Sequence, residues 1–194
     1  MTPKIRALLF DAGNTLVFPQ VGQLARELSR WGYPASREDF HKAECTGKAR
    51  LDEWLLPLLK NGDVPRQTDY FYWKEYLSAL VDIVRVPEEK KWEISLQIAE
   101  GFKRIGTWSE VVPETPTYLE TLRRRGYFMG VISNSLGLIE EQLQRVGLAG
   151  YFTFILDSHY VGVEKPHPEI FQQALDRAGC EPAEAVYIGD LYST

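Results

Sequence analysis

The sequence predicts an α/β fold with a parallel sheet, and two patterns lead to this prediction. From about Pro113 onward, short apolar segments that end abruptly in polar residues alternate with amphipathic segments. This alternation is typical of parallel strands that are joined by crossover helices. In addition, a long stretch with helical periodicity separates the first apolar segment from the others. We therefore predict a parallel α/β core that is interrupted by an inserted helical region.

Four short apolar segments are expected to form the strands of this sheet. They are RALLF at 6–10, GYFMGVIS at 126–133, YFTFILDS at 151–158 and AVYIGD at 185–190. Helix-like segments precede the last three strands, at residues 116–126, 136–148 and 168–179. Ligands of parallel sheets bind at the carboxyl ends of the strands. Polar residues at these ends could therefore meet at one edge, namely Asp11, Ser133, Asp157 and Asp190.

The inserted region, at about residues 18–108, is rich in Leu, Trp, Tyr, Lys and Glu and shows little strand-like alternation. Its periodicity predicts four amphipathic helices. They are expected at residues 21–32, 37–59, 68–84 and 88–102, with a loop at 60–67 between the second and the third. Aromatic residues of these helices are expected mainly to pack them together, and some could line a cleft. They include Trp54, Tyr70, Tyr72 and Trp73.

Composition narrows the class of protein. The chain has 194 residues with a formal net charge of −5, so its overall charge disfavours binding to nucleic acid. No apolar run approaches the roughly 20 residues that span a bilayer, and the start of the chain lacks the pattern of a cleavable leader. Cys45 and Cys180 are expected to be isolated thiols. We expect a soluble cytoplasmic protein with no nucleic-acid or membrane partner.

Four segments, in order along the chain, resemble the haloacid dehalogenase-like (HAD) hydrolase superfamily. They are LLFDAGNTL at 8–16, GVISNS at 130–135, VGVEKPHPEIF at 161–171 and AVYIGD at 185–190. The resemblance implies an α/β fold, a Rossmann-like parallel sheet core with an inserted helical cap domain. The core would comprise residues 1–17 and 109–194, and the cap residues 18–108. Hydrolysis of a small phosphorylated metabolite is the activity that the resemblance implies.

Each motif then implies a role for its polar residue. Asp11 matches the family nucleophile, a carboxylate that forms a covalent intermediate which water hydrolyses; taken alone, it could be a turn-forming aspartate. Ser133 matches the phosphate-holding hydroxyl of the second motif. Lys165 matches the basic residue of the third motif, whose positive charge stabilises developing negative charge. Asp11, Ser133 and Lys165 are thus the expected catalytic residues, and Thr15 and Asn134 join Ser133 and Lys165 in substrate binding.

The resemblance also implies a Mg²⁺ cofactor. In the family pattern the metal ligands are the first aspartate, a backbone carbonyl two residues later and an aspartate of the fourth motif. These positions match Asp11, the carbonyl of Gly13 and Asp190. Oxygen atoms are the ligands that Mg²⁺ prefers, and the ion would polarise an incoming phosphate. The alternative for Asp190 is a cap on a following helix.

Gly13 departs from the pattern of the family phosphatases, which carry a second aspartate there as general acid and base. Such catalysis contributes about a hundred- to ten-thousand-fold. In a first interpretation the protein is still a Mg²⁺-dependent phosphohydrolase. Its proton donor would then come from the cap or from the substrate. Alternatively, no donor is needed because the leaving group is acidic. Candidate cap donors are His41, Glu44, Asp52 and Glu53.

Two further interpretations stay open. The protein could act at carbon, like the family dehalogenases, or on a carbon–phosphorus bond. The latter reaction needs a cap lysine that forms an imine, for which Lys42, Lys48, Lys60 and Lys74 are present. Alternatively, it could be a binding or regulatory module of low activity. The metal-binding aspartate of the fourth motif argues against the dehalogenase branch, and the retained nucleophile, hydroxyl and lysine argue against the binding module.

Two smaller expectations complete the sequence-based description. His167 stands where an acidic residue is expected between two prolines, and we interpret it as a surface loop residue. The sequence stops at GDLYST, before the next acidic residue, helix and strand of the family pattern. We therefore expect the printed chain to be a piece of a longer product.

Overall fold

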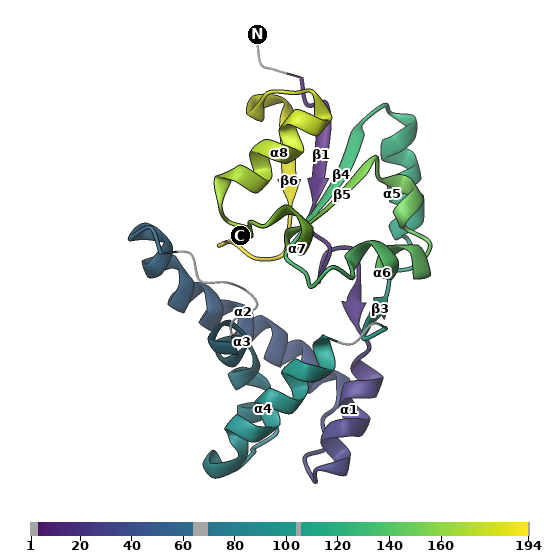
Figure 1. Cartoon of the computed structure of the whole chain (residues 1–194). Helices are drawn as coiled ribbons and strands as arrows, with labels where there is room; N and C mark the ends of the chain where they lie inside the picture. Colours follow the sequence, from purple (N-terminus) through teal and green to yellow (C-terminus); the bar gives the residue numbers. More distant parts are fainter. Residues whose placement is uncertain (1–3, 64–69, 104–105, 194) are drawn as a thin grey trace. The chain divides into compact units, whose positions relative to one another are not determined.

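The structure is a computed structural model that describes residues 4–63, 70–103 and 106–193, and the side chains of residues 70–73 lie outside this description. The chain divides into two compact units, which are considered separately (Figure 1). The core unit comprises residues up to Pro19 together with Trp108–Tyr192. The helical unit comprises Gln20–Thr107. No helix among the described residues is long and apolar enough to cross a membrane.

A four-stranded parallel sheet forms the centre of the core unit, which confirms the predicted fold class. Its strands stand in the order β5-β4-β1-β6. They are β1 (Ala7–Phe10), β4 (Phe128–Ser133), β5 (Phe154–Asp157) and β6 (Ala185–Ile188). Each strand lies inside a segment that the sequence predicted. Because all strands run in parallel, their carboxyl ends meet at one edge, where Ser133 and Asp157 are neighbours in register.

Helices cover the two faces of this sheet (Figure 1). They are α5 (Thr115–Arg124), α6 (Ile139–Arg145) and α8 (Pro168–Ala178). Alternate strand residues point to opposite faces. Leu8 and Phe10 accordingly pack into a cluster with α5 and α6, whereas Leu9 packs into a cluster with α8. The buried strands of the core therefore show nearly continuous apolar runs in the sequence.

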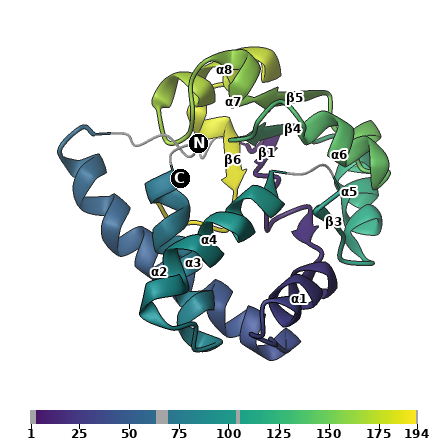
Figure 2. The same ribbon diagram turned by 60° about the horizontal axis from the view of Figure 1, so that its bottom comes forward.

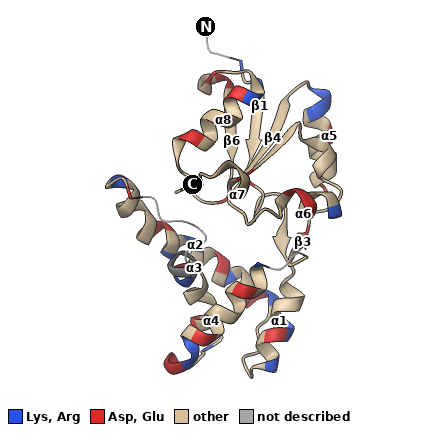
Figure 3. Cartoon of the chain, viewed as in Figure 1, with Lys and Arg blue, Asp and Glu red and all other residues tan. Residues whose placement is uncertain are grey.

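Charged side chains at the helix ends of the core unit follow the direction of the helix dipole. Arg123 and Arg124 lie in the last turn of α5, and Glu140 and Glu141 lie in the first turn of α6. Figure 3 shows these basic and acidic positions at the ends of the two helices. Each charge faces the partial charge of opposite sign at its helix terminus, which stabilises the helix modestly.

Some short elements of the core unit were not predicted from the sequence. Two short strands, β2 (Phe18–Pro19) and β3 (Trp108–Glu110), form an antiparallel pair. One short helix, α7 (Ser158–Val161), directly follows β5. The 3₁₀ turns are η1 (Ala149–Tyr151) and η2 (Pro182–Glu184). These elements are too short for helical periodicity, and none is an apolar run of four or more residues like those of the parallel sheet.

The described residues of the helical unit contain four helices, at the positions that the periodicity predicted. They are α1 (Val21–Arg30), α2 (Arg37–Lys60), α3 (Tyr70–Ile83) and α4 (Glu88–Phe102). Ser36 begins α2 with a capping box, in which its hydroxyl accepts from the Asp39 backbone and the Asp39 carboxylate accepts from the Ser36 backbone. Figure 2 shows α2, α3 and α4, of which α3 packs against both others. The predicted loop at 60–67 is described only as far as Asp63; residues 64–67 lie outside the described residues.

A close approach of two helix backbones depends on Gly47 in α2. A Cβ atom at this position would lie 2.5 Å from the backbone oxygen of Tyr76 in α3. Gly47→Ala is therefore expected to push the two helices apart and to reduce the free energy of unfolding by about 1–2 kcal/mol, even after the gain in helix propensity. Chemical denaturation measures this change.

Gly22→Ala in α1 is the matched control, because its new Cβ would contact only the end of the Arg26 side chain, at 3.6 Å. We expect this control to leave stability unchanged or slightly raised. Equal losses in both variants would contradict the close-approach explanation.

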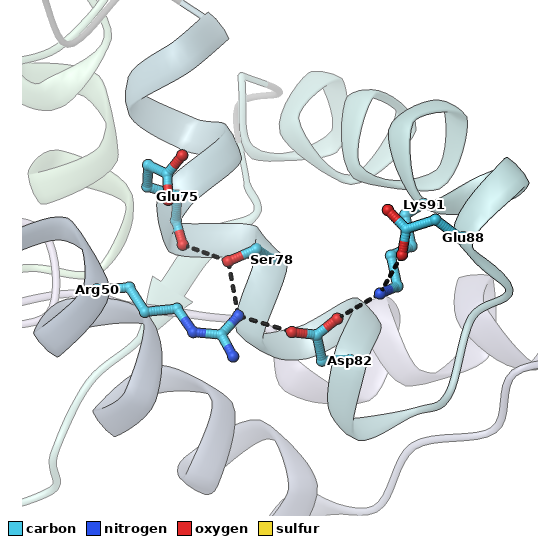
Figure 4. A network of polar contacts seen from close by, with 6 residues as sticks. All are labelled: Arg50, Glu75, Ser78, Asp82, Glu88 and Lys91. Atoms are coloured by element: carbon cyan, nitrogen blue, oxygen red, sulfur yellow. Dashed lines mark hydrogen bonds and ion pairs between the residues drawn. The ribbon is translucent and has the colours of Figure 1, made fainter. Parts of the chain in front are cut away.

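A network of polar contacts joins α2, α3 and α4 through Asp82 (Figure 4). One carboxylate oxygen of Asp82 accepts from Arg50 at 2.7 Å, and the other lies 2.8 Å from Lys91. Arg50 also donates to the Ser78 hydroxyl at 2.8 Å, and Lys91 also pairs with Glu88 at 2.7 Å. Partial burial opposes ionisation of Asp82, but the hydrogen bonds from Lys91 and Arg50 outweigh it and lower the pKa of this carboxyl group.

Asp82→Asn is expected to lower the melting temperature by about 2 °C at pH 7 in low salt, because half-exposed ion pairs contribute less than about 1 kcal/mol. The pKa of Asp82 is lowered in the folded protein, so its contribution is present above the unfolded-state pKa and disappears as the pH falls through the folded-state value. Melting curves of wild type and variant should thus converge at acidic pH. They should also converge in about 1 M salt, which screens the pair; a difference independent of pH and salt would contradict this assignment.

Candidate active site

Asp11 lies directly after β1, at the carboxyl edge of the core sheet. Its backbone N–H donates to the Ile188 carbonyl of β6 at 2.8 Å, which continues the pairing of the strands by one residue. The backbone N–H of Ala12 donates to Oδ1 of Asp11 at 2.6 Å. The Asp11 side chain is 12% exposed. The end of β1 therefore presents a nearly buried carboxylate, of which Oδ1 already accepts a hydrogen bond from the backbone.

The segment after Asp11 is a tight turn that closes on Ala12. The Ala12 carbonyl accepts from the backbone N–H groups of Thr15, Leu16 and Val17, at 2.8–3.3 Å. Asn14 takes a left-handed conformation with φ of 52°, which asparagine tolerates better than most residues. Oγ1 of Thr15 and Oδ1 of Asn14 are buried and have no hydrogen-bond partner among the described residues. A buried hydroxyl without a partner is suited to a hydrogen bond with a polar ligand.

Lys165 supplies the positive charge of this site. Its Nζ lies 2.8 Å from Oδ1 of Asp11, and its side chain is 3% exposed. The same Nζ donates to the hydroxyl of Tyr187 in β6 at 2.7 Å. Asn134, at the end of β4, holds the Lys165 backbone: it donates to the carbonyl at 2.9 Å and accepts from the N–H at 2.7 Å. The Tyr187 hydroxyl thus holds the ammonium group next to Asp11, and Asn134 holds the backbone of the same lysine.

The surroundings of Asp11 act on its pKa in opposite directions, and burial is the largest influence. Burial raises the pKa of the Asp11 carboxyl above its ordinary value, and the pairing with Lys165 acts in the opposite direction. The nearby carboxylate of Asp190 raises the pKa of Asp11 further. A second cation at this position would oppose the effect of Asp190 and favour the ionised form of Asp11.

The other sequence-predicted site residues differ in how they contribute. Ser133 ends β4 and is buried at the same edge of the sheet. Asn134 was expected to bind substrate, and in the structure its side-chain amide holds the backbone of Lys165. His167 is exposed, in keeping with the interpretation as a surface loop residue. Its side chain also caps α8 by accepting from the backbone of Glu169 at 3.3 Å.

Two residues to which the sequence assigned no role support the site. Asp157 ends β5, where its carboxylate accepts from the Ser135 hydroxyl at 2.6 Å and from the His159 backbone at 3.0 Å. It therefore orders the loop that follows Ser133. Tyr187 is the second, through its contact with Lys165. The position of Asp157 at a strand end was a signal in the sequence, whereas nothing in the sequence distinguished Tyr187 from a core aromatic residue.

Gly13 occupies a position next to an indole ring. A Cβ atom on Gly13 would lie 3.4 Å from Cζ3 of Trp108, in ordinary van der Waals contact. Glycine provides no proton donor on this side of Asp11. A carbonyl can still act as a ligand, so Gly13 remains compatible with a metal that Asp11 and Asp190 would share.

The helical unit holds the residues that were considered as proton donors or imine-forming lysines. Lys42 is paired with Glu38 and Lys48 with Glu44, both at 2.7 Å. Oδ1 of Asp52 is buried and has no hydrogen-bond partner among the described residues. Trp54 is half-buried. The side chains of Tyr70, Tyr72 and Trp73, which were expected to pack the helices, lie outside the described residues.

Comparison with known proteins assigns the family. The sequence matches the family model of haloacid dehalogenase-like hydrolases over residues 5–192. Glyceraldehyde 3-phosphate phosphatase of Methanopyrus kandleri is 37% identical over 191 residues, which cover 96% of this chain and 76% of that protein. Phosphoserine phosphatase of Thermus thermophilus is 33% identical over 195 residues, which cover 97% of this chain and 75% of that protein.

A mouse relative is matched over a shorter stretch. Haloacid dehalogenase-like hydrolase domain-containing protein 3 of Mus musculus is 35% identical over 122 residues, which cover 62% of this chain and 48% of that protein. The matched part thus spans about half the length of the mouse relative and about three quarters of the Methanopyrus and Thermus proteins.

Solved structures show the same fold. A HAD phosphatase from Thermococcus onnurineus has a TM-score of 0.53 and 23% identity, and the similarity covers 98% of this chain and 79% of that one. L-2-haloacid dehalogenase from Xanthobacter autotrophicus has a TM-score of 0.54 and 19% identity, with coverages of 94% and 69%. One is named a phosphatase and the other a dehalogenase, so the fold alone does not select the reaction. Because the family match includes all four motif segments, and relatives above 30% identity align along nearly the whole chain, the protein belongs to the haloacid dehalogenase-like hydrolases, as its motifs predicted.

Proposed function

We propose that the protein is a Mg²⁺-dependent phosphohydrolase that acts on a small phosphorylated metabolite through an aspartyl-phosphate on Asp11. The observation that carries this proposal is the buried Asp11–Lys165 pair, 2.8 Å apart at the carboxyl edge of the parallel sheet. Two of the relatives that align along nearly the whole chain are named as phosphatases of glyceraldehyde 3-phosphate and phosphoserine, and these names support it.

The two oxygen atoms of Asp11 would divide their tasks. Oδ1 accepts from Lys165 and from the backbone of Ala12, and this leaves Oδ2 to attack. In the first step Oδ2 forms a bond to phosphorus while the bond from phosphorus to the ester oxygen breaks, and the leaving group departs with the electron pair of that bond. In the second step water attacks phosphorus, the bond to Oδ2 breaks, and phosphate leaves as Asp11 is regenerated.

Lys165 and the polar groups at the strand ends would bind the phosphoryl oxygens. The ammonium group offsets the negative charge of both the nucleophile and the transferring group. The Ser133 hydroxyl and the unpaired Thr15 hydroxyl would donate to phosphoryl oxygens. Asn134 would contribute by holding the Lys165 backbone.

The residues present fit a bound Mg²⁺. Asp11, the Gly13 carbonyl and Asp190 would supply oxygen ligands, and water and phosphate the others. The described residues contain no group of three or more His, Cys, Asp or Glu side chains placed to hold a metal, so oxygen atoms other than carboxylates would have to complete the ligand set. When bound, Mg²⁺ would polarise the phosphoryl group and screen it from the carboxylates.

Gly13 would favour substrates whose leaving group needs no proton. A phosphate ester of low leaving-group pKa, or an acyl phosphate, can lose its leaving group as an anion. Phosphate esters of ordinary alcohols would need a proton donor, supplied by the substrate or by the helical unit. We therefore expect this site to hydrolyse substrates with acidic leaving groups directly. Substrates with poor leaving groups would need an additional proton donor.

The test is hydrolysis of a panel that pairs aryl and acyl phosphates with alkyl phosphates, with Mg²⁺ and with chelator. Asp11→Asn removes the attacking oxygen and is expected to abolish turnover. Turnover that is Mg²⁺-dependent and lost in this variant supports the proposal. Turnover that persists in Asp11→Asn, or no turnover of any phosphate by the folded wild type, rejects it.

Reaction at carbon is a second candidate, favoured by the missing acid at Gly13. A dehalogenase would release halide from a 2-haloacid in the presence of chelator. A phosphonate-cleaving enzyme would be trapped on a lysine by borohydride. The pairing with Glu38 raises the pKa of the Lys42 amine, which is unfavourable for imine formation at that residue.

A further inference from the structure

The geometry points to Tyr187 as the residue that positions Lys165 for reaction, through a hydrogen bond between its hydroxyl and the Lys165 ammonium group. Lys165 is anchored at its backbone by Asn134, but the flexible part of its side chain has four carbon atoms beyond the backbone. An ammonium group at the end of such a chain needs a second fixed acceptor to keep one direction. This inference rests on the proposed function, since it assigns how the catalytic lysine of that same site is aimed.

Two acceptors hold the ammonium group of Lys165. Oδ1 of Asp11 lies 2.8 Å away and the Tyr187 hydroxyl 2.7 Å away, and the side chain is 3% exposed. The ammonium also lies 5.3 Å from the centre of the Tyr187 ring. Because Nζ is close to the hydroxyl oxygen but distant from the ring centre, it lies beyond the hydroxyl end of the ring and not over the face of the ring. The contact is therefore a hydrogen bond, which removal of one oxygen atom would abolish.

Tyr187 is itself held in place, as a positioning residue must be. Its ring packs edge-on against Phe171 of α8, with centroids 5.2 Å apart and an angle of 90° between the ring planes. On another side it lies against Gly189, where a Cβ atom would come within 3.0 Å of the tyrosine ring. The absence of a side chain at Gly189 thus makes room for the ring. Strand β6, helix α8 and this glycine together fix the direction of the hydroxyl.

The position of the ammonium group matters because Asp11 changes role during the reaction. Before attack its carboxylate carries a full charge, and afterwards that charge lies on phosphoryl oxygens. An ammonium held by Asp11 alone would follow the carboxylate, whereas one that Tyr187 also holds stays at a fixed point between the two charges. Groups preorganised toward developing charge stabilise the transition state more than the ground state. Loss of the hydroxyl should therefore lower kcat and leave KM nearly unchanged.

Tyr187→Phe tests this inference, because it removes the hydroxyl and keeps the ring that packs on Phe171 and Gly189. We expect kcat on an aryl phosphate to fall roughly tenfold, with KM within about twofold, since a hydrogen bond to a charged group contributes about this much. Tyr118→Phe is the matched control, because it removes the same hydroxyl from a tyrosine of α5 that is 66% exposed. Both variants should melt near the wild-type temperature.

A second measurement works without any substrate. The ¹⁵N signal of the Lys165 ammonium group should be visible in the wild type, because a buried ammonium with two acceptors exchanges slowly with water; Lys165→Arg assigns it by its disappearance. In Tyr187→Phe this signal should broaden or vanish. A missing wild-type signal, a signal unchanged in Tyr187→Phe, or an unchanged kcat would each overturn the positioning role. The wild type could hydrolyse no phosphate while the Lys165 signal still responds to Tyr187→Phe as expected. This result would reject the proposed function and the catalytic role of Tyr187, and would leave the hydrogen bond between Tyr187 and Lys165 as a structural contact.

Discussion

Lys165→Met is expected to lower kcat on phosphate substrates by about a hundred- to a thousandfold. Removing one preorganised charged donor from a water-poor site typically costs on this order. Here the side chain is 3% exposed and its Nζ lies 2.8 Å from Asp11, so no water can replace it at equal strength. Methionine has similar length and flexibility, so the change removes the charge with little loss of packing.

The same variant should move the pH dependence of the reaction. Asp11 must be ionised to attack. Burial raises the pKa of Asp11 and Lys165 lowers it, so removal of Lys165 raises that pKa further. The acid side of the kcat/KM profile should therefore shift toward higher pH, measured at saturating Mg²⁺ in both proteins.

An exposed lysine provides the control for this prediction. Lys90→Met changes the same residue type at an exposed position of α4, and neither the rate nor the pH profile should change. A Lys165→Met protein that is folded and retains more than about a tenth of the wild-type kcat would contradict the assigned role.

Gly13→Asp is expected to raise the rate on alkyl phosphates by roughly ten- to a hundredfold and to leave the rate on aryl phosphates nearly unchanged. General acid catalysis contributes about a hundred- to ten-thousand-fold, and a newly placed acid should provide part of this. Only poor leaving groups gain, because a leaving group of low pKa departs without a proton. The ratio of kcat/KM for the two substrate types measures the effect.

The structure has room for the beginning of this side chain. Gly13 does not adopt a positive φ, so an L-residue is not strained there. The new Cβ atom would be in ordinary contact with the Trp108 ring at 3.4 Å, and the carboxyl group must point away from that ring. If the indole blocks the carboxyl group, Gly13→Asp combined with Trp108→Ala should show the gain that the single variant lacks.

Gly150→Asp is the control for added charge. Gly150 is exposed and has no positive φ, and a Cβ atom added to it would have no other atom within 4 Å. This control should alter neither substrate type. Equal losses on alkyl and aryl phosphates in folded Gly13→Asp would show that residue 13 does not face the leaving group.

The sequence by itself determined the elements of the core and the places where its polar residues emerge. Continuous apolar runs identified strands that are buried on both faces, and their polar ends identified Asp11 and Ser133. The helices α1, α2 and α4 were equally visible, because amphipathic periodicity over ten or more residues is a local property. The family resemblance added the roles, which no pattern of burial could supply.

Only the tertiary structure decided how these residues are held. Lys165 meets Asp11, Asn134 and Tyr187 across separations of 22 or more residues, and such contacts depend on the order of strands in the sheet. Asp157 was visible as a strand end, yet its use in ordering the loop after β4 required its neighbour in register. Periodicity reports which side of an element is buried, whereas the partner of a buried polar atom is set by packing between elements that are distant in the chain.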